Sequence, residues 1–147
     1  MPVIVVGADS PLGAAIAHTL RGRSGERRAF VSDPTVAERL RADGFKVAVG
    51  DVSDASHVEW ASLGCFTAVL VCQAASDGRE IAFADGPGAV IDGWLRAIRE
   101  AEVARVIVVG PDQGAHPEVE WAVVDPAGRS PADVAAAVAR LDDAARI

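Results

Sequence analysis

Several kinds of residue are scarce in this 147-residue chain, and each scarcity excludes a class of protein. Only two cysteines are present, Cys65 and Cys72, which is too few for a disulfide-stabilised secreted scaffold. No apolar run approaches the roughly 20 residues of a membrane-spanning helix, and no secretory signal pattern opens the sequence. We therefore expect a cytoplasmic protein with reduced thiols. The three histidines and two cysteines lack metal-ligand spacing, so we predict no metal site.

Positive charge is also in short supply. Lysine and arginine together number 14 against 21 acidic residues, which gives a net charge of −7. This balance argues against nucleic acid and anionic membranes as partners. The acidic excess lies in residues 51–147, whereas residues 1–50 carry seven basic and five acidic side chains. The N-terminal third is therefore the part that tolerates an anionic ligand best.

The sequence does contain a regular alternation of strand and helix patterns over residues 1–147, without a linker or an internal repeat. Short apolar runs rich in β-branched residues predict six strands, at residues 3–6, 29–31, 45–49, 68–72, 106–109 and 119–124. Pairs of a capping residue and proline open helices at Ser10, Asp33 and Ser130. Further helices are predicted around Val58 and over residues 90–98, and residues 73–88 form the longest predicted loop.

This alternation predicts a single α/β domain of the doubly wound, Rossmann-like type. We expect a mostly parallel sheet of about six strands, with helices on both faces. Ligands in such sheets bind beyond the carboxyl ends of the strands, between the first and fourth strands. Only nine residues separate the last two predicted strands, whereas a parallel crossover usually needs a dozen or more. We therefore expect residues 119–124 to run antiparallel at the sheet edge or to pair elsewhere.

A turn containing two glycines joins the first strand to the first helix. Its sequence is Gly7-Ala8-Asp9-Ser10-Pro11-Leu12-Gly13. Gly7 permits a sharp turn, and Gly13 lets the helix pack closely on the sheet. The N-terminus of the helix offers N–H groups and the positive end of its dipole to a pyrophosphate. Because the turn follows a strand and opens a helix, we interpret it as a dinucleotide-binding turn rather than an ordinary capped turn.

Over nearly the whole chain, these features resemble the short-chain dehydrogenase/reductase superfamily, in its atypical, NmrA-like or NAD(P)H-binding branch. Gly7 and Gly13 match the first and third glycines of that branch's Gly-x-x-Gly-x-x-Gly motif, and Ser10 replaces the middle glycine. Residues 31–34 resemble the end of the second strand, where the adenosine ribose is read. Gly50-Asp51-Val52-Ser53-Asp54 is similar to the family's Gly-Asp-(Val/Leu)-Thr-Asp, whose first aspartate borders the adenine.

The resemblance implies a nicotinamide dinucleotide, NAD or NADP, as cofactor. The residues assigned to this site by the resemblance and by the fold are Gly7, Asp9, Ser10, Leu12, Gly13, Ser32, Asp33, Asp51, Val52, Gln73 and Ala74. Position 32 is not arginine, which favours NAD slightly over NADP. Asp33 is equally well explained as the N-cap of the next helix, and Asp51 as a turn residue before the capping pattern Ser56-x-x-Glu59.

The residues that transfer protons in this superfamily are missing. Its catalytic members use a Tyr-x-x-x-Lys pair, whereas this chain has no tyrosine and a single lysine, Lys46, on the third predicted strand. The helix that carries the pair is absent, and Pro111-Asp112-Gln113 replaces the expected catalytic serine. His116 with Asp112 is the one other candidate acid–base pair. We expect a non-catalytic dinucleotide-binding or sensing protein, or a weak NAD(P)H-dependent reductase, since hydride transfer needs no protein nucleophile.

Two other interpretations stay open. Residues 33–63 also resemble the ligand-gating nucleotide domains of potassium transporters and channels, although the first motif of those domains has glycine where this chain has Asp9. Alternatively, a Rossmann-shaped domain that has lost its ligand would serve as a protein-interaction or dimerisation module. The candidate surfaces for a homodimer are the helix around Trp94 and the edge strand with Trp121, because an unprotected sheet edge needs a cover.

Overall fold

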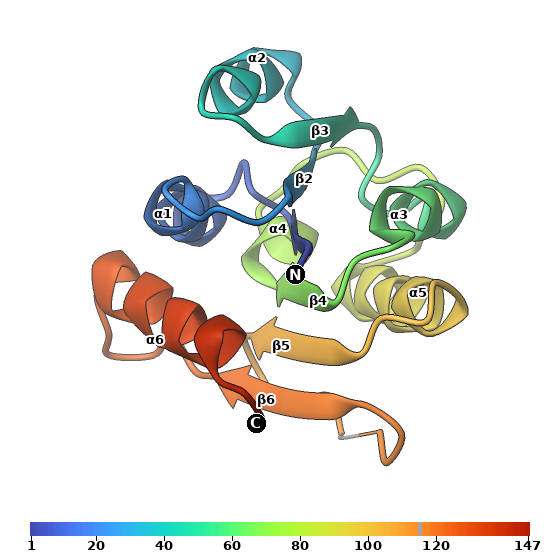
Figure 1. The fold of residues 1–147 in the computed structure, drawn as a ribbon. Coiled ribbons are helices and arrows are strands. Elements are labelled where there is room, and N and C mark those ends of the chain that lie inside the picture. The colour runs from blue at the N-terminus through green and yellow to red at the C-terminus, as the bar shows by residue number, and fades with distance from the viewer. Residues whose placement is uncertain (115) are drawn as a thin grey trace.

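The computed structural model describes residues 1–114 and 116–147. In this part of the chain, six parallel strands form one sheet in the order β3-β2-β1-β4-β5-β6 (Figure 1). Their bounds are β1 Val3–Val6, β2 Arg27–Val31, β3 Lys46–Val49, β4 Thr67–Val71, β5 Arg105–Val109 and β6 Glu120–Val124. The strand order reverses between the central strands β1 and β4. The predicted Rossmann-like α/β fold is therefore confirmed.

Helices cover both faces of this sheet. Their bounds are α1 Pro11–Leu20, α2 Pro34–Ala42, α3 Ala55–Ser62, α4 Gln73–Ser76, α5 Pro87–Glu100 and α6 Pro131–Asp143. Helix α1 packs against α6 on one face, and α3 packs against α5 on the other (Figure 1). The short helix α4 lies inside the region that the sequence predicts as a loop. None of the helices in the described residues has the length and apolar character needed to cross a membrane.

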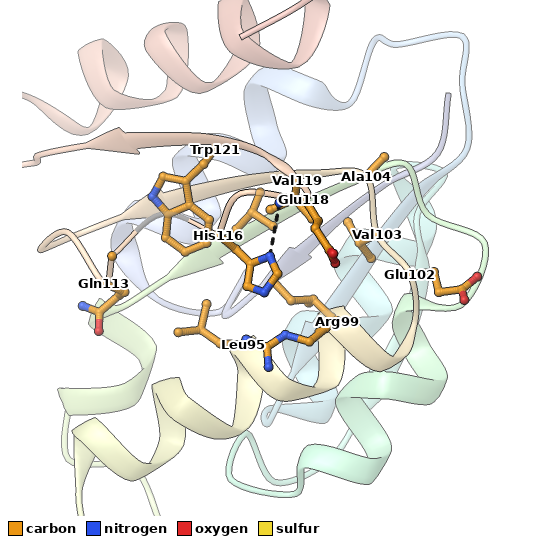
Figure 2. A pocket seen from close by; sticks show the side chains of 13 residues that line it. Leu95, Arg99, Glu102, Val103, Ala104, Gln113, His116, Glu118, Val119 and Trp121 are labelled. Carbon is orange, nitrogen blue, oxygen red and sulfur yellow. Dashed lines mark hydrogen bonds between the residues drawn. The ribbon is translucent and has the colours of Figure 1, made fainter.

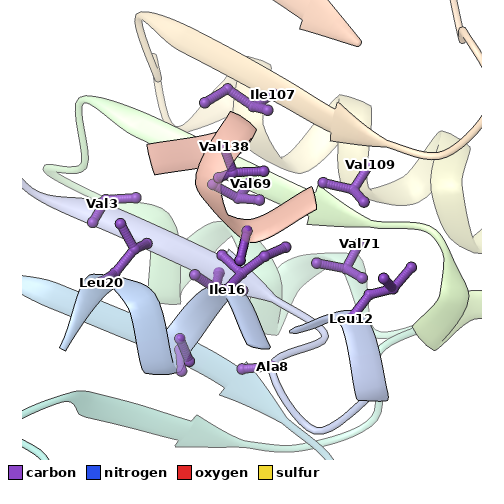
Figure 3. Packing of buried hydrophobic residues seen from close by; sticks show 14 of the residues in the cluster. Val3, Ala8, Leu12, Ile16, Leu20, Val69, Val71, Ile107, Val109 and Val138 are labelled. Atoms are coloured by element: carbon purple, nitrogen blue, oxygen red, sulfur yellow. The ribbon is translucent and has the colours of Figure 1, made fainter. Parts of the chain in front are cut away.

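The strands are apolar throughout because successive side chains enter two different cores. Val69 of β4 packs among residues of α1 and α6, including Ile16 and Val138 (Figure 3). Its neighbour Leu70 points to the opposite face and packs in the core that contains Trp94 of α5. Trp94 itself is completely buried, so a contact surface on α5 has to come from other residues of that helix.

The last strand is parallel to its neighbour, so the expected antiparallel orientation is wrong. Arg105 pairs with Glu120 and Val109 pairs with Val124, in the same direction as the rest of the sheet. The sequence-based argument assumed a helical crossover. A strand of five residues spans only about 17 Å, and an extended chain covers about 3.3 Å per residue. The ten residues between β5 and β6 can therefore return to the start of the sheet without a helix.

The helix starts show which capping signals the fold uses. The side chains of Ser10 and Ser130 cap α1 and α6, as predicted, by accepting hydrogen bonds from the backbone N–H three residues later. Asp33 caps α2 by accepting a hydrogen bond from the backbone N–H two residues later, Thr35 N, at 2.8 Å. Helix α3 begins earlier than the Ser56-x-x-Glu59 pattern predicts. Its cap is Asp54, whose carboxylate accepts a hydrogen bond from His57 N at 3.3 Å.

Candidate functional site

The predicted site residues gather at the carboxyl edge of the sheet. Residues 7–13 follow β1, residues 32–33 follow β2, residues 51–52 follow β3, and residues 73–74 follow β4. Because the strands are parallel, their four ends lie side by side (Figure 1). The sheet order brings together segments that are far apart in the sequence, at the position where doubly wound folds bind ligands.

The two glycines of the first turn are required by packing within the turn. Gly7 has a φ of +91°, which L side chains rarely adopt, and a Cβ there would lie 2.5 Å from the Cβ of the buried Ala74. A Cβ on Gly13 would lie 2.0 Å from the carbonyl oxygen of Gly7. The glycines thus hold β1, α1 and α4 close together, and Ala74 acts as a packing residue beneath the turn.

Most backbone donors at the start of α1 are engaged within the turn itself. Pro11 has no N–H, and Gly13 N donates to Ser10 Oγ at 3.1 Å. Leu12 N donates to a residue outside the turn, the side-chain oxygen Oε1 of Gln73, at 2.9 Å. Gln73 is only partly buried. A ligand that displaces the Gln73 side chain can therefore accept a hydrogen bond from Leu12 N.

Asp9 connects the turn to the end of β2. One carboxylate oxygen, Oδ2, accepts hydrogen bonds from the N–H groups of Ser32 at 2.8 Å and Asp33 at 3.1 Å. The other oxygen, Oδ1, lies 2.7 Å from Nη1 of Arg79. The Asp9 side chain is only 5% exposed. Asp9 therefore orients the corner of the site where the resemblance places the adenosine ribose.

Arg79 belongs to this corner, although no sequence motif points to it. Its guanidinium pairs with Asp9 and also with Asp77 at 2.6 Å, and it lies 3.4 Å from Ser32 Oγ. The hydrogen bond from Arg79 lowers the pKa of Asp77, and the two carboxylates raise the pKa of Arg79 above its usual range. The only available signal was that Arg79 is the one basic residue in residues 73–88.

Asp51 is held by three hydrogen bonds, as Asp9 is. Its Oδ1 accepts hydrogen bonds from Ser53 N at 2.8 Å and Ser53 Oγ at 2.6 Å, and its Oδ2 accepts one from Ala82 N at 2.8 Å. Burial acts to raise the pKa of Asp51, but these hydrogen bonds outweigh it and hold the pKa below its usual value. The neighbouring Val52 is buried, and its carbonyl accepts a hydrogen bond from Trp94 Nε1 at 2.7 Å.

A cleft of about 770 Å³ adjoins the first turn, between α1, α4 and the ends of β5 and β6. Its walls are largely apolar and include Pro11, Leu12 and Val123. The polar side chains that line it are Gln73, Asp112 and Asp125. None of these is a tyrosine or a lysine. The cleft therefore offers a largely apolar surface beside the first turn, without the side chains that transfer protons in catalytic relatives.

His116 and Asp112 line different hollows, so the structure does not support them as an acid–base pair. Asp112 lines the cleft and accepts a hydrogen bond from Gly114 N at 2.9 Å. His116 lines a separate groove of about 530 Å³ between α5 and the β5–β6 connection (Figure 2). There its ring Nδ1 accepts a hydrogen bond from Glu118 N at 3.4 Å. The two hollows share no lining residue.

The fold and the site together define a Rossmann-type nucleotide-binding domain. A family model described as NAD(P)H-binding matches residues 7–143, and the chain therefore belongs to the NAD(P)H-binding family. This confirms the NAD(P)H-binding branch that the resemblance predicts. It also supports a nicotinamide dinucleotide as the ligand, without distinguishing NAD from NADP. A search of curated proteins found no match.

Solved structures share this fold. ChuY, an anaerobillin reductase from Escherichia coli O157:H7, superposes with a TM-score of 0.73 at 16% identity, over 99% of this chain and 92% of that chain. A putative epimerase from Bacteroides thetaiotaomicron gives 0.73 at 17% identity, with coverages of 99% and 92%. Triphenylmethane reductase from Citrobacter sp., complexed with NADP(H), gives 0.61 at 20% identity. This chain spans 37% of that longer protein, and 75% of this chain is covered.

Proposed function

We propose that the protein binds a nicotinamide dinucleotide across the carboxyl ends of β1 to β4 and acts as a binding or sensing protein. The observation that carries this proposal is the convergence of three separate polar groups on one edge of the sheet. These are the Leu12 N–H, the Ser32 hydroxyl and the ionised Asp51 carboxylate. They come from three strand ends in a chain whose family is NAD(P)H-binding.

Each of these groups suits a different part of the dinucleotide. The Leu12 N–H, at the positive end of the α1 dipole, would hold the pyrophosphate. Ser32 and Asp33 would bond the adenosine ribose, and Asp51 would accept a hydrogen bond from the adenine amino group. The dinucleotide, when bound, supplies hydride chemistry. The chain's own contribution is to bind and orient it beside the apolar cleft.

The chemistry of the cleft favours a binding or sensing role over a reductase. The polar residues that line it are one glutamine and two aspartates, and none of them is a tyrosine or a lysine. The tyrosine and lysine that donate and tune a proton in catalytic relatives have no counterpart in the sequence. A substrate that must be protonated as it accepts a hydride would therefore find no suitable donor among these side chains.

Charge at the ribose corner supports NAD rather than NADP as the cofactor. Asp9, Asp33 and Asp77 surround this corner, against the single guanidinium of Arg79. A 2′-phosphate carries close to two negative charges and would have to approach these three carboxylates. The 2′-hydroxyl of NAD can instead donate a hydrogen bond to one of them.

A titration with NADH and NADPH, followed by tryptophan fluorescence, tests this function. Trp60 on α3 and Trp94 on α5 serve as donors for energy transfer to the nicotinamide. These two helices pack together on one face of the sheet. We expect saturable NADH binding with a Kd below about 100 μM, or roughly −5.5 kcal/mol, and weaker NADPH binding. No saturation with either nucleotide up to the millimolar range would overturn the proposal.

A protein-interaction role is the second candidate, and the groove in Figure 2 is the observation that favours it. Leu95, Val119 and Trp121 give it an apolar floor beside the edge strand β6. Apolar grooves next to the free edge of a sheet are typical contact surfaces. Sedimentation of the purified protein at several concentrations tests whether it forms a homodimer, and a Trp121→Arg variant tests whether this groove mediates it.

A further inference from the structure

Residues 77–83 form a strap that crosses the carboxyl edge of the sheet. The strap follows β4 and α4, yet its hydrogen bonds go to the ends of β1, β2 and β3. Arg79 bonds Asp9 at 2.7 Å, and Ala82 N donates to Asp51 Oδ2 at 2.8 Å. Phe83 N donates to Ser53 Oγ at 3.0 Å. One short segment therefore spans three of the four strand ends that make up the proposed site.

The strap uses the same groups that the proposed function assigns to the adenosine half of the dinucleotide. At Asp51, the Ala82 N–H takes the place of the adenine amino group as hydrogen-bond donor. At Ser32, Arg79 Nη1 lies 3.4 Å from the hydroxyl that would face the ribose. The backbone N–H of Ala82 lies 2.8 Å from Asp51 Oδ2 and blocks the side from which an adenine would approach this oxygen. The strap and the adenosine therefore compete for this half of the site.

The strap is attached mainly by polar contacts, and Ile81 is the strap residue that packs against the apolar core. Ala82 and Phe83 are exposed, and Phe83 is 68% exposed despite its large aromatic ring. Arg79 is shielded as well, since its side chain is only 13% exposed between Asp9 and Asp77. Segments with few buried apolar contacts open locally at low free energy. The Arg79–Asp9 ion pair is therefore a main contact that holds the strap closed.

We infer that the strap is an autoinhibitory element, which competes with the dinucleotide and is held closed by the Arg79–Asp9 ion pair. This inference rests on the proposed function and adds regulation to it. In the closed state the strap covers Asp51 and the ribose corner. In the open state those groups become available. The apparent Kd for the dinucleotide is then the intrinsic Kd divided by the fraction of molecules that are open.

The test compares NADH affinity in the wild type, in Arg79→Gln and in Arg96→Gln. Arg96 is an exposed arginine on α5, so its substitution removes the same charge without touching the strap. We expect Arg79→Gln to bind NADH about five- to tenfold more tightly than the other two proteins, which is the lower range of typical coupling between sites. If Arg79→Gln binds NADH as tightly as the wild type or more weakly, the inference that the strap is autoinhibitory is overturned.

A second variant and a second readout keep the test independent of how Arg79→Gln folds. Ala82→Pro removes the N–H that Asp51 accepts and should also tighten NADH binding. In the wild type, hydrogen exchange of the Ala82 and Phe83 amides should accelerate when NADH is added, because both lose their acceptors. Slower exchange of these amides would show closure over the ligand and would overturn the inference.

The outcomes separate this inference from the proposed function. Equal and saturable NADH binding by wild type, Arg79→Gln and Ala82→Pro overturns the strap and leaves the dinucleotide site standing. If none of them binds NADH saturably, the proposed function is overturned, and with it the inference that the strap competes with the dinucleotide. Tighter NADH binding in both strap variants, with Arg96→Gln unchanged, supports both.

Discussion

Replacing Asp9 with asparagine isolates what its carboxylate contributes to the fold. The substitution keeps the shape and the oxygen that accepts the N–H groups of Ser32 and Asp33. It places a neutral amide beside Arg79, 2.7 Å from the present carboxylate oxygen. Removing one partner of a buried ion pair costs about 3–5 kcal/mol. Because Arg79 keeps Asp77 and both arginine and aspartate retain some solvent contact, we expect a smaller loss, of about 1–2 kcal/mol.

Thermal denaturation followed by far-UV circular dichroism measures this loss as a shift in Tm. For a domain of this size, 1 kcal/mol corresponds to roughly 2–4 °C in Tm, so we expect Asp9→Asn to melt about 2–8 °C below the wild type. The matched control is Asp142→Asn, which removes one of the two carboxylate partners of Arg23 at the opposite edge of the sheet. Arg23 is 24% exposed against 13% for Arg79, so this substitution should cost less. A Tm for Asp9→Asn equal to that of the wild type would refute the role of Asp9 as the connection between β1, β2 and the strap.

Three further predictions concern the ligand and pH. Ser32→Arg adds a cation where the ribose corner has only Arg79, so the ratio of NADPH to NADH affinity, measured by fluorescence titration, should rise at least tenfold; an unchanged ratio would place the ribose elsewhere. Gln73→Ala frees the Leu12 N–H and should tighten NADH binding by about two- to fivefold in the same assay, whereas weaker binding would make Gln73 a ligand. Asp51 and Asp77 have lowered pKa values in the fold, so they stabilise it above about pH 4 and lose this contribution as the pH falls through their folded values. The Tm of Asp51→Asn should therefore depend less on pH between 5 and 3 than that of the wild type.

The strands and most helix starts could be predicted from the sequence because local signals determine them. Apolar runs that alternate between two cores, such as Val69 and Leu70, read as buried strands wherever they occur. Side-chain caps at Ser10, Asp33 and Ser130 act within three residues of themselves. The direction of β6 could not be predicted in this way, because it depends on the conformation of a connection that carries no periodic pattern.

The polar network of the site was predictable only in part. The resemblance identified Asp51 and Ser32, and the structure places both at the carboxyl edge. It could not identify Arg79, whose partner Asp9 lies 70 residues away in the sequence and meets it only because β1 and β4 are neighbours. The amphipathic pattern put Trp94 among the apolar positions of its helix, but such a pattern does not say how completely a large aromatic residue is covered. The packing of α5 against α3 buries it.

Titration of ¹⁵N-labelled protein with NADH, followed by amide chemical shifts, tests the central claim most directly, because it reports both whether the dinucleotide binds and where. We predict saturable shifts at Leu12, Ser32, Val52 and Ala82, at the carboxyl ends of β1 to β4, with little change at Val119 and Trp121 in the groove beside α5. No shift at a millimolar concentration of NADH, or shifts confined to that groove, would contradict the account.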